Sequence, residues 1–124
     1  MGSEIMIKET NTIKFFKEIC KIPHGTFNEV GVADYLCDFA KERNLEFYRD
    51  AKNNVLIKKK TLDAAPIILQ SHTDMVTVKL EEKEFDFEKD EIEVYEEDGY
   101  LKARGTTLGA DNGIRSCSNF KYFR

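Results

Sequence analysis

One stretch of the sequence decides the expected fold: Pro66-Ile67-Ile68-Leu69-Gln70-Ser71-His72-Thr73-Asp74. Its apolar run, residues 67–69, is short and continuous, which is typical of a β-strand buried on both faces of a helix-covered sheet. Polar residues follow the run at once. His72 and Asp74 would therefore stand at the carboxyl end of the strand, where ligands bind in open α/β sheets.

Two helices are predicted before this strand. The first covers 11–21, where apolar residues recur at intervals of three and four. Asn11 or Thr12 is expected to cap its start, and Pro23 to end it.

The second helix is predicted to begin after the turn at 23–26 and to reach about Arg43. Thr26 stands three residues before Glu29, which fits a capping box that satisfies two free backbone donors. Asn44 is a suitable residue to end the helix.

Alternating or β-branched runs predict four further strands: 45–49, 55–57, 92–95 and 100–103. The pair Asp98-Gly99 between the last two is a strong hairpin signal. The acidic segment 80–90 lacks a clear period and is predicted to be a loop. Helices followed by strands favour an α/β sandwich, with a mixed sheet more consistent than an all-parallel one.

Composition narrows the classes of function. The 124 residues amount to one ordinary domain, and the formal net charge of -4 argues against nucleic acid as a partner. No apolar run approaches the roughly 20 residues that cross a bilayer, and we expect neither a membrane span nor a signal peptide. Three irregularly spaced cysteines suggest no disulfide framework; we expect small buried thiols in a reducing cytoplasm.

His72 and Asp74 are candidate site residues. Positions two apart in an extended chain point to the same side, so both side chains would face one site. Imidazole and carboxylate are suitable zinc ligands, although the carboxylate can instead orient the imidazole. The alternative is a surface His and Asp at a strand end, since the pattern HxD is common by chance.

Asp111 lies in a stretch rich in small residues, 105–113, with glycines at 105, 109 and 113. Glycine allows unusual dihedrals and close approach of the backbone. Asp111 is either an inward-facing metal ligand or the N-cap residue of a turn-rich loop. His24, the remaining histidine, is expected to be a surface residue of a turn.

Taken together, the ordered segments resemble one family. They are Ile22-Pro23-His24-Gly25-Thr26-Phe27-Asn28-Glu29, Asn53-Asn54-Val55-Leu56-Ile57, Gln70-Ser71-His72-Thr73-Asp74-Met75-Val76 and Gly105-Thr106-Thr107-Leu108-Gly109-Ala110-Asp111-Asn112-Gly113-Ile114. The chain resembles the N-terminal part of an aminoacyl-histidine dipeptidase, also called cytosol non-specific dipeptidase, of the aminoacylase and carboxypeptidase G group of zinc exopeptidases.

The resemblance implies a three-layer αβα catalytic domain with a mixed sheet and a site for two zinc ions. It implies that His72 is a terminal ligand of one zinc, that Asp74 clamps His72 and supports catalysis, and that Asp111 bridges both metals, often with a cis bond to Asn112. Cobalt or manganese is also compatible with nitrogen and oxygen ligands. The implied reaction is hydrolysis of a small peptide by an activated water with a glutamate base.

Residues 115–124 depart from the family pattern. The resemblance assigns 1–114 to the catalytic domain, whereas the family continues with a glycine where Arg115 stands. The tail 115–124 contains no Glu, Asp or His. We therefore expect a truncated or frameshifted, inactive dipeptidase fragment in the cytoplasm; the alternative is a non-catalytic metal-binding or interaction remnant. The preferred dipeptide and the oligomeric state stay open.

Overall fold

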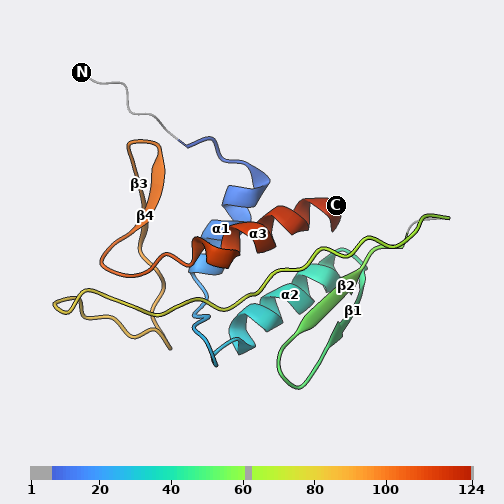
Figure 1. The fold of residues 1–124 in the computed structure, drawn as a ribbon, viewed down its shortest axis with the longest axis horizontal. Helices are drawn as coiled ribbons and strands as arrows, with labels where there is room; N and C mark the ends of the chain where they lie inside the picture. The colour runs from blue at the N-terminus through green and yellow to red at the C-terminus, as the bar shows by residue number, and fades with distance from the viewer. Residues whose placement is uncertain (1–6, 61–62, 124) are drawn as a thin grey trace.

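The computed structural model describes residues 7–60 and 63–123. Figure 1 shows the order of the elements along the chain. The elements are α1 (Asn11–Cys20), α2 (Val30–Glu42), β1 (Glu46–Arg49), β2 (Val55–Lys58), β3 (Val94–Glu97), β4 (Tyr100–Ala103), α3 (Ala110–Phe120) and the 3-10 helix η1 (Lys121–Phe123).

Helix α1 confirms the first predicted helix, with its cap one residue earlier than expected. The side chain of Thr10, and not Asn11 or Thr12, accepts a hydrogen bond from the Ile13 N–H at 3.3 Å. A threonine hydroxyl at this position satisfies a donor that the helix leaves free. The apolar face of α1 is buried, as its period predicted.

Helix α2 is also confirmed, but the capping box is wrong. The Thr26 hydroxyl donates to Asp74, and the Glu29 carboxylate accepts from the N–H of Phe27. Helix α2 therefore starts without a side-chain cap. Asn44 follows the helix with a φ of 54°, in agreement with its predicted role as the stop.

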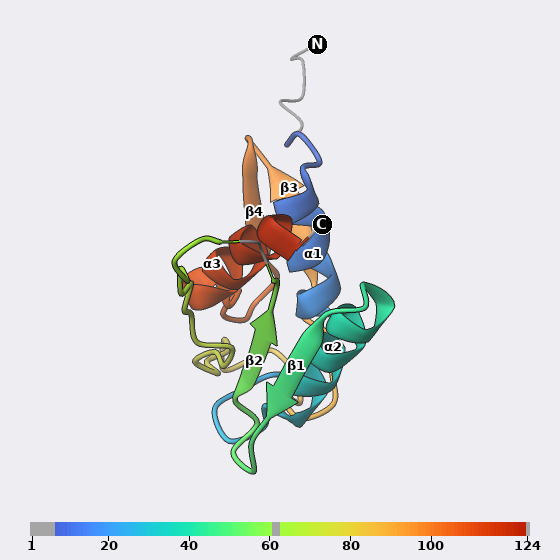
Figure 2. The same ribbon diagram turned by 90° about the vertical axis from the view of Figure 1, so that its right-hand side faces the viewer.

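The strands form two separate hairpins. β1 pairs antiparallel with β2, and β3 pairs antiparallel with β4. Asp98 and Gly99 have φ values of 52° and 80°, as a tight hairpin turn requires. Figure 2 shows β1 and β2 beside α2, with β3 and β4 at the other end of the molecule near α1.

The strand predicted at 67–69 is wrong. Ile67 and Ile68 are 86% and 84% exposed, and the segment belongs to no sheet of the described chain. No backbone group of residues 65–70 takes part in a hydrogen bond within the described ranges. A β-strand is defined by backbone hydrogen bonds to a neighbouring strand. An apolar run that has no neighbouring strand therefore remains extended and exposed to solvent. For the same reason, the described residues contain no mixed sheet.

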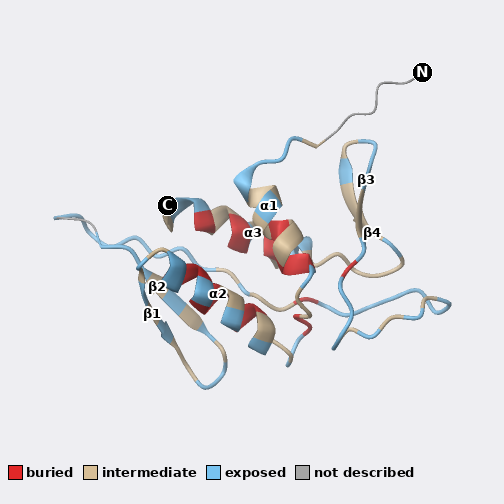
Figure 3. Ribbon diagram, turned by 180° about the vertical axis from the view of Figure 1, so that it is seen from behind, coloured by how far each residue is buried: buried red, intermediate tan, exposed pale blue. Residues whose placement is uncertain are grey.

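The core lies where the three helices meet. Figure 3 shows the buried residues gathered on the facing sides of α1, α2 and α3. Phe120 of α3 stacks on Phe39 of α2 with ring centroids 4.7 Å apart, and Phe15 of α1 meets it edge-on at 5.2 Å. The three thiols, Cys20, Cys37 and Cys117, are buried, as the sequence predicted, and none of them forms a disulfide in the described residues.

Residues 115–120 continue α3 and contribute to this core, because Ser116, Cys117 and Phe120 are buried. Segment 80–90 is a loop, as predicted. Among residues 7–60 and 63–123, no helix combines the length and apolar character needed to cross a membrane.

Candidate functional site

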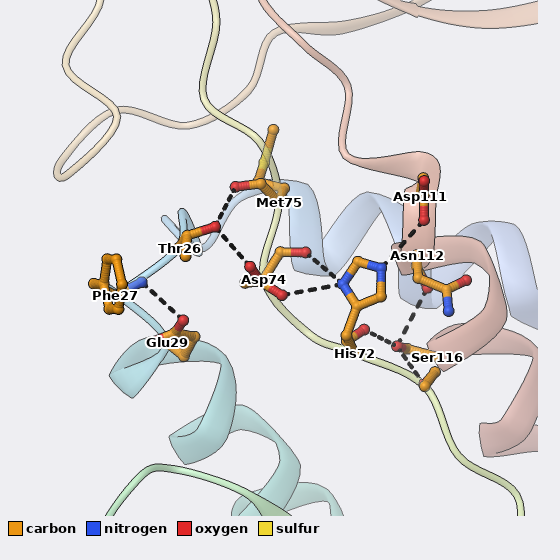
Figure 4. Close-up of polar contacts among 10 residues, drawn as sticks. Thr26, Phe27, Glu29, His72, Asp74, Met75, Asp111, Asn112 and Ser116 are labelled. Atoms are coloured by element: carbon orange, nitrogen blue, oxygen red, sulfur yellow. Dashed lines mark hydrogen bonds and ion pairs between the residues drawn. The ribbon is translucent and has the colours of Figure 1, made fainter.

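The imidazole of His72 lies between two carboxylates (Figure 4). Its Nδ1 is 3.0 Å from Oδ1 of Asp74, and its Nε2 is 3.1 Å from Oδ1 of Asp111. The structure thus confirms that His72 and Asp74 face one place, as alternation in an extended chain predicted. It also brings Asp111, 39 residues further along the chain, to the same imidazole.

The backbone at the start of α3 presents Asp111. Gly109, with a φ of 80°, precedes α3, but Asp111 (φ -95°, ψ 102°) and Asn112 (φ -117°, ψ 31°) are not helical, so regular helix begins after them. Among the described residues the Asp111 carboxylate accepts no hydrogen bond from a backbone N–H of the following turn and lies against His72 instead. A Cβ on Gly109 would meet Sδ of Met75 at 3.0 Å, and glycine is therefore needed for the close approach as well as for the dihedral. The Asp111-Asn112 bond is cis, as the resemblance implied.

Ser116 ties the backbone of His72 to α3. Its buried hydroxyl lies 3.1 Å from the carbonyl oxygen of His72 and 2.8 Å from Oγ of Ser71. Sequence reasoning missed this contact, because Ser116 belongs to the atypical tail. The sequence signal that could have indicated it is the spacing of four residues between Asn112 and Ser116, which places Ser116 one helical turn after the candidate site.

Asp74 is held at both carboxylate oxygens. Oδ1 faces His72, and Oδ2 accepts a 2.6 Å hydrogen bond from the hydroxyl of Thr26. The hydroxyl bond from Thr26 is the main cause that holds the pKa of Asp74 below its usual value. Asp74 is therefore ionised across the neutral range, as an acceptor for the imidazole must be.

The surroundings of His72 favour a positive charge at its ring. Desolvation lowers the pKa of His72, but the hydrogen bonds to Asp111 and Asp74 outweigh it and raise the pKa. A carboxylate only accepts hydrogen bonds, so both ring nitrogens must donate in this arrangement. Either a proton on Nε2 or a cation bound in its place satisfies Nε2 and Asp111 together.

His24 does not lie on the surface, and that prediction is wrong. It is 3% exposed, its Nδ1 is 2.6 Å from the carbonyl oxygen of Ile22, and burial lowers the pKa of its imidazole. The Met75 N–H donates to the carbonyl oxygen of His24 at 3.0 Å. This contact covers the turn with a segment that is distant in sequence, so the turn motif gave no sign of it.

The donor set fits a zinc ion in kind. An imidazole nitrogen and a carboxylate oxygen on one spot are preferred zinc ligands. Within residues 7–60 and 63–123, however, no group of three His, Cys, Asp or Glu side chains is arranged to hold a metal ion. A groove of about 780 Å³ runs beside Asp111 and Asn112 and is bordered by Gln70 and Arg115.

Two comparisons with known proteins identify relatives; no family model matches the chain. The chain is 43% identical over 107 residues, 83% of its length, to the cytosol non-specific dipeptidase of Escherichia coli (strain K12). Its fold matches the crystal structure of aminoacylhistidine dipeptidase from Vibrio alginolyticus with a TM-score of 0.86, 38% identity and 97% of the chain covered.

The chain spans only 22% and 26% of the length of these two proteins. Identity above one third, together with near-complete structural coverage of the chain, establishes common descent and the α/β fold. By sequence and by fold, the chain is a homologue of the cytosol non-specific dipeptidases, as its motifs had indicated.

Proposed function

We propose that this chain supplies one part of a metal-dependent dipeptidase centre. In this proposal His72 and Asp111 are metal ligands, and Asp74 orients His72. The observation that carries it is the imidazole of His72, with Nδ1 against one carboxylate and Nε2 aimed at another. The names of both relatives support peptide-bond hydrolysis as the reaction, with dipeptides, Xaa-His among them, as substrates.

The residues contribute distinct chemistry. Asp74 accepts a hydrogen bond from Nδ1–H of His72, which leaves the lone pair of Nε2 for a cation once Nε2 is deprotonated. Asp111 presents Oδ1 to the same place, and its Oδ2 has no partner in the described residues and is available to a second cation. A zinc ion, when bound, polarises a peptide carbonyl and lowers the pKa of water; cobalt or manganese would serve the same ligands.

By itself, the 124-residue chain is expected to be inactive. Two ligands hold a zinc ion much less tightly than the four of a structural site. No glutamate in the described residues contacts His72, Asp74 or Asp111, and Glu29 is bonded to the N–H of Phe27 instead. Among residues 7–60 and 63–123, therefore, no glutamate is placed to transfer a proton beside the candidate ligands, which supports the expected inactivity.

A cytoplasmic location belongs to the proposal. It is supported by the name of the Escherichia coli relative and by three buried thiols that form no disulfide. The second candidate function is a non-catalytic metal-binding or interaction chain. The exposed segment 67–69, with its unpaired backbone, favours that candidate.

Zinc titration of the purified chain, followed by calorimetry and by the NMR signals of the His72 ring, tests the metal site. We expect weak binding that His72→Ala and Asp111→Ala abolish. Asp38→Ala removes an exposed carboxylate from α2 and serves as the control, with unchanged binding. Saturation with zinc that leaves the His72 signals unmoved would rule out the assigned ligands.

Hydrolysis of an Xaa-His dipeptide, assayed with and without zinc, tests the expectation that the chain by itself is inactive. We expect no turnover. Zinc-dependent turnover that disappears in His72→Ala would keep the metal site but refute the expected inactivity.

A further inference from the structure

Thr26 carries a role that the capping motif does not explain, because its hydroxyl turns away from α2 toward Asp74. We infer that Thr26 is a positioning residue: it fixes the carboxylate of Asp74 and, through it, the orientation and tautomer of the His72 imidazole. One consequence of this role, tighter metal binding at His72, rests on the proposed function. The arrangement itself is a property of this chain.

The hydrogen bonds form a chain of three side chains. The hydroxyl of Thr26 donates to Oδ2 of Asp74 at 2.6 Å, and Oδ1 of the same carboxylate lies 3.0 Å from Nδ1 of His72. Figure 4 shows the three side chains in line, with Asp111 beyond the far ring nitrogen. A carboxylate held at one oxygen can rotate about its last bond, whereas one held at both oxygens keeps a single orientation.

Backbone contacts deliver the hydroxyl to this place. Gly25 forms a parallel bridge with Met75, and the N–H of Thr26 donates to the carbonyl oxygen of Met75 at 3.3 Å. Residue 75 directly follows Asp74, so the two segments are fixed to each other beside the carboxylate. A Cβ on Gly25 would meet Cγ2 of Thr77 at 2.7 Å, so the approach depends on glycine.

The fixed carboxylate selects one tautomer of His72. Nδ1 faces two acceptors of Asp74, Oδ1 at 3.0 Å and the main-chain oxygen at 3.1 Å. Within the described residues, Nε2 faces a single acceptor, Oδ1 of Asp111, whose side chain is 97% exposed. The neutral ring therefore keeps its proton on Nδ1 and presents the lone pair of Nε2, which is the form that binds a metal.

Two substitutions separate the hydroxyl from the rest of the side chain. Thr26→Val keeps the shape and removes the hydroxyl, while Thr26→Ser keeps the hydroxyl and removes the methyl group. Thr26 is exposed, so neither variant removes a core contact, and the amide spectra of α1 and α3 verify the fold.

The first measurement is the ¹⁵N spectrum of the His72 ring in the full, metal-free chain at a fixed pH above its titration. We expect protonation at Nδ1 in the wild type and in Thr26→Ser, and a mixture of tautomers in Thr26→Val. An unchanged ring spectrum in Thr26→Val would overturn the inference. A merely structural role would not move the tautomer in a folded variant.

The second measurement is zinc affinity. We expect it to fall by up to about tenfold in Thr26→Val, the lower end of the loss that is typical when the hydrogen-bond partner of a metal ligand is removed. We expect it to recover in Thr26→Ser. The two measurements fail separately. Absence of zinc binding in every chain refutes the proposed function and leaves the ring spectra to decide on Thr26. Binding that needs His72, together with an unmoved tautomer in Thr26→Val, refutes this inference alone.

Should Thr26→Val not fold, the wild type carries the test. The three-bond couplings of Thr26 and Asp74 then report the χ1 angle of each side chain. A single rotamer for both supports the inference, and averaged couplings overturn it.

Discussion

Gly109 is the residue on which the position of Asp111 most depends. Replacement by alanine places a Cβ on a backbone with a φ of 80° and 3.0 Å from Sδ of Met75. The left-handed conformation costs a residue with a Cβ about 1–2 kcal/mol, and the contact with Met75 adds to this. We predict that Gly109→Ala lowers the free energy of unfolding by at least that amount, measured by urea denaturation.

The exposed neighbour Ala110 provides the control, since Ala110→Ser is expected to stay within roughly 0.5 kcal/mol of the wild type. Equal stability of Gly109→Ala and the wild type would show that the loop before α3 has another conformation.

The two thiols of the helical core predict an effect of alkaline pH. Burial raises the pKa of Cys20 and of Cys117 from 9.0 to about 12. Above pH 9.0 the thiols of the unfolded chain release protons that the folded chain retains. The free energy of unfolding therefore falls as the pH rises from 9.0 to about 12. Each thiol accounts for at most about 1.4 kcal/mol per pH unit.

Urea midpoints measured at a series of pH values from neutral to alkaline test this effect. The double variant Cys20→Ala, Cys117→Ala is expected to lose less stability per pH unit; part of the slope remains, because burial also raises the pKa of Tyr35. Identical slopes for the variant and the wild type would exclude the thiols as the cause.

The sequence predicted single residues well where the signal was local. The period of two placed His72 and Asp74 on one side, and their hydrogen bond agrees. The roles of Thr26 and Ser116 escaped prediction because their partners lie 48 and 44 residues away. A capping motif considers only the nearby backbone groups to which a hydroxyl can bond. The hydroxyl of Thr26 instead donates to the carboxylate of Asp74, which is distant in sequence.

Among the elements, α3 makes the contact that joins the helices into one core. Phe120 is 5% exposed and packs against Phe15, Tyr35 and Phe39. We predict that Phe120→Ala lowers the free energy of unfolding by about 3–5 kcal/mol, as expected for an aromatic ring removed from a packed interior. Thermal or urea denaturation measures the loss.

Tyr122, two residues further along, is 55% exposed, and Tyr122→Ala is expected to change stability by roughly 0.5 kcal/mol or less. A Phe120→Ala variant as stable as Tyr122→Ala would mean that α3 does not pack on the other helices in solution.

Prediction of the elements succeeded or failed according to where their hydrogen bonds lie. Helices and hairpins satisfy their own backbone groups, so α1, α2 and the two hairpins followed from period and turn residues, although β3 (Val94–Glu97) begins two residues later than the strand predicted at 92–95. The segment 67–69 needs partner strands on both sides, and no described residue supplies them. Its apolar composition was identified correctly, but burial depends on neighbours that composition does not specify.

At the scale of the whole molecule, the run 67–69 is a stretch of exposed apolar side chains, with Ile67 86% and Ile68 84% exposed. Unpaired backbone groups beside exposed apolar side chains invite pairing with another chain. We predict concentration-dependent self-association, measured by sedimentation velocity, that Ile68→Lys reduces. Phe27→Lys makes the same charge change at a side chain that is 97% exposed on a turn, and it should not reduce association.

An equal reduction in both variants would attribute the association to net charge. An undiminished association in Ile68→Lys would place the contact elsewhere.

The hydroxyl of Ser116 has a consequence for any ion that binds at His72. Within the described residues, the backbone of residues 65–70 takes part in no hydrogen bond, so the contacts of this hydroxyl with Ser71 and with the carbonyl oxygen of His72 hold this part of the chain to α3. Because Ser116 lies inside α3 beside the buried Cys117, these contacts are lost only when α3 comes away from the core, and the imidazole then separates from Asp111 in an opening that hydrogen exchange detects. An ion that recognises only the closed arrangement then binds with its intrinsic affinity multiplied by the closed fraction. Occupancy at His72 thus reports on the integrity of a helix turn more than forty residues away in sequence.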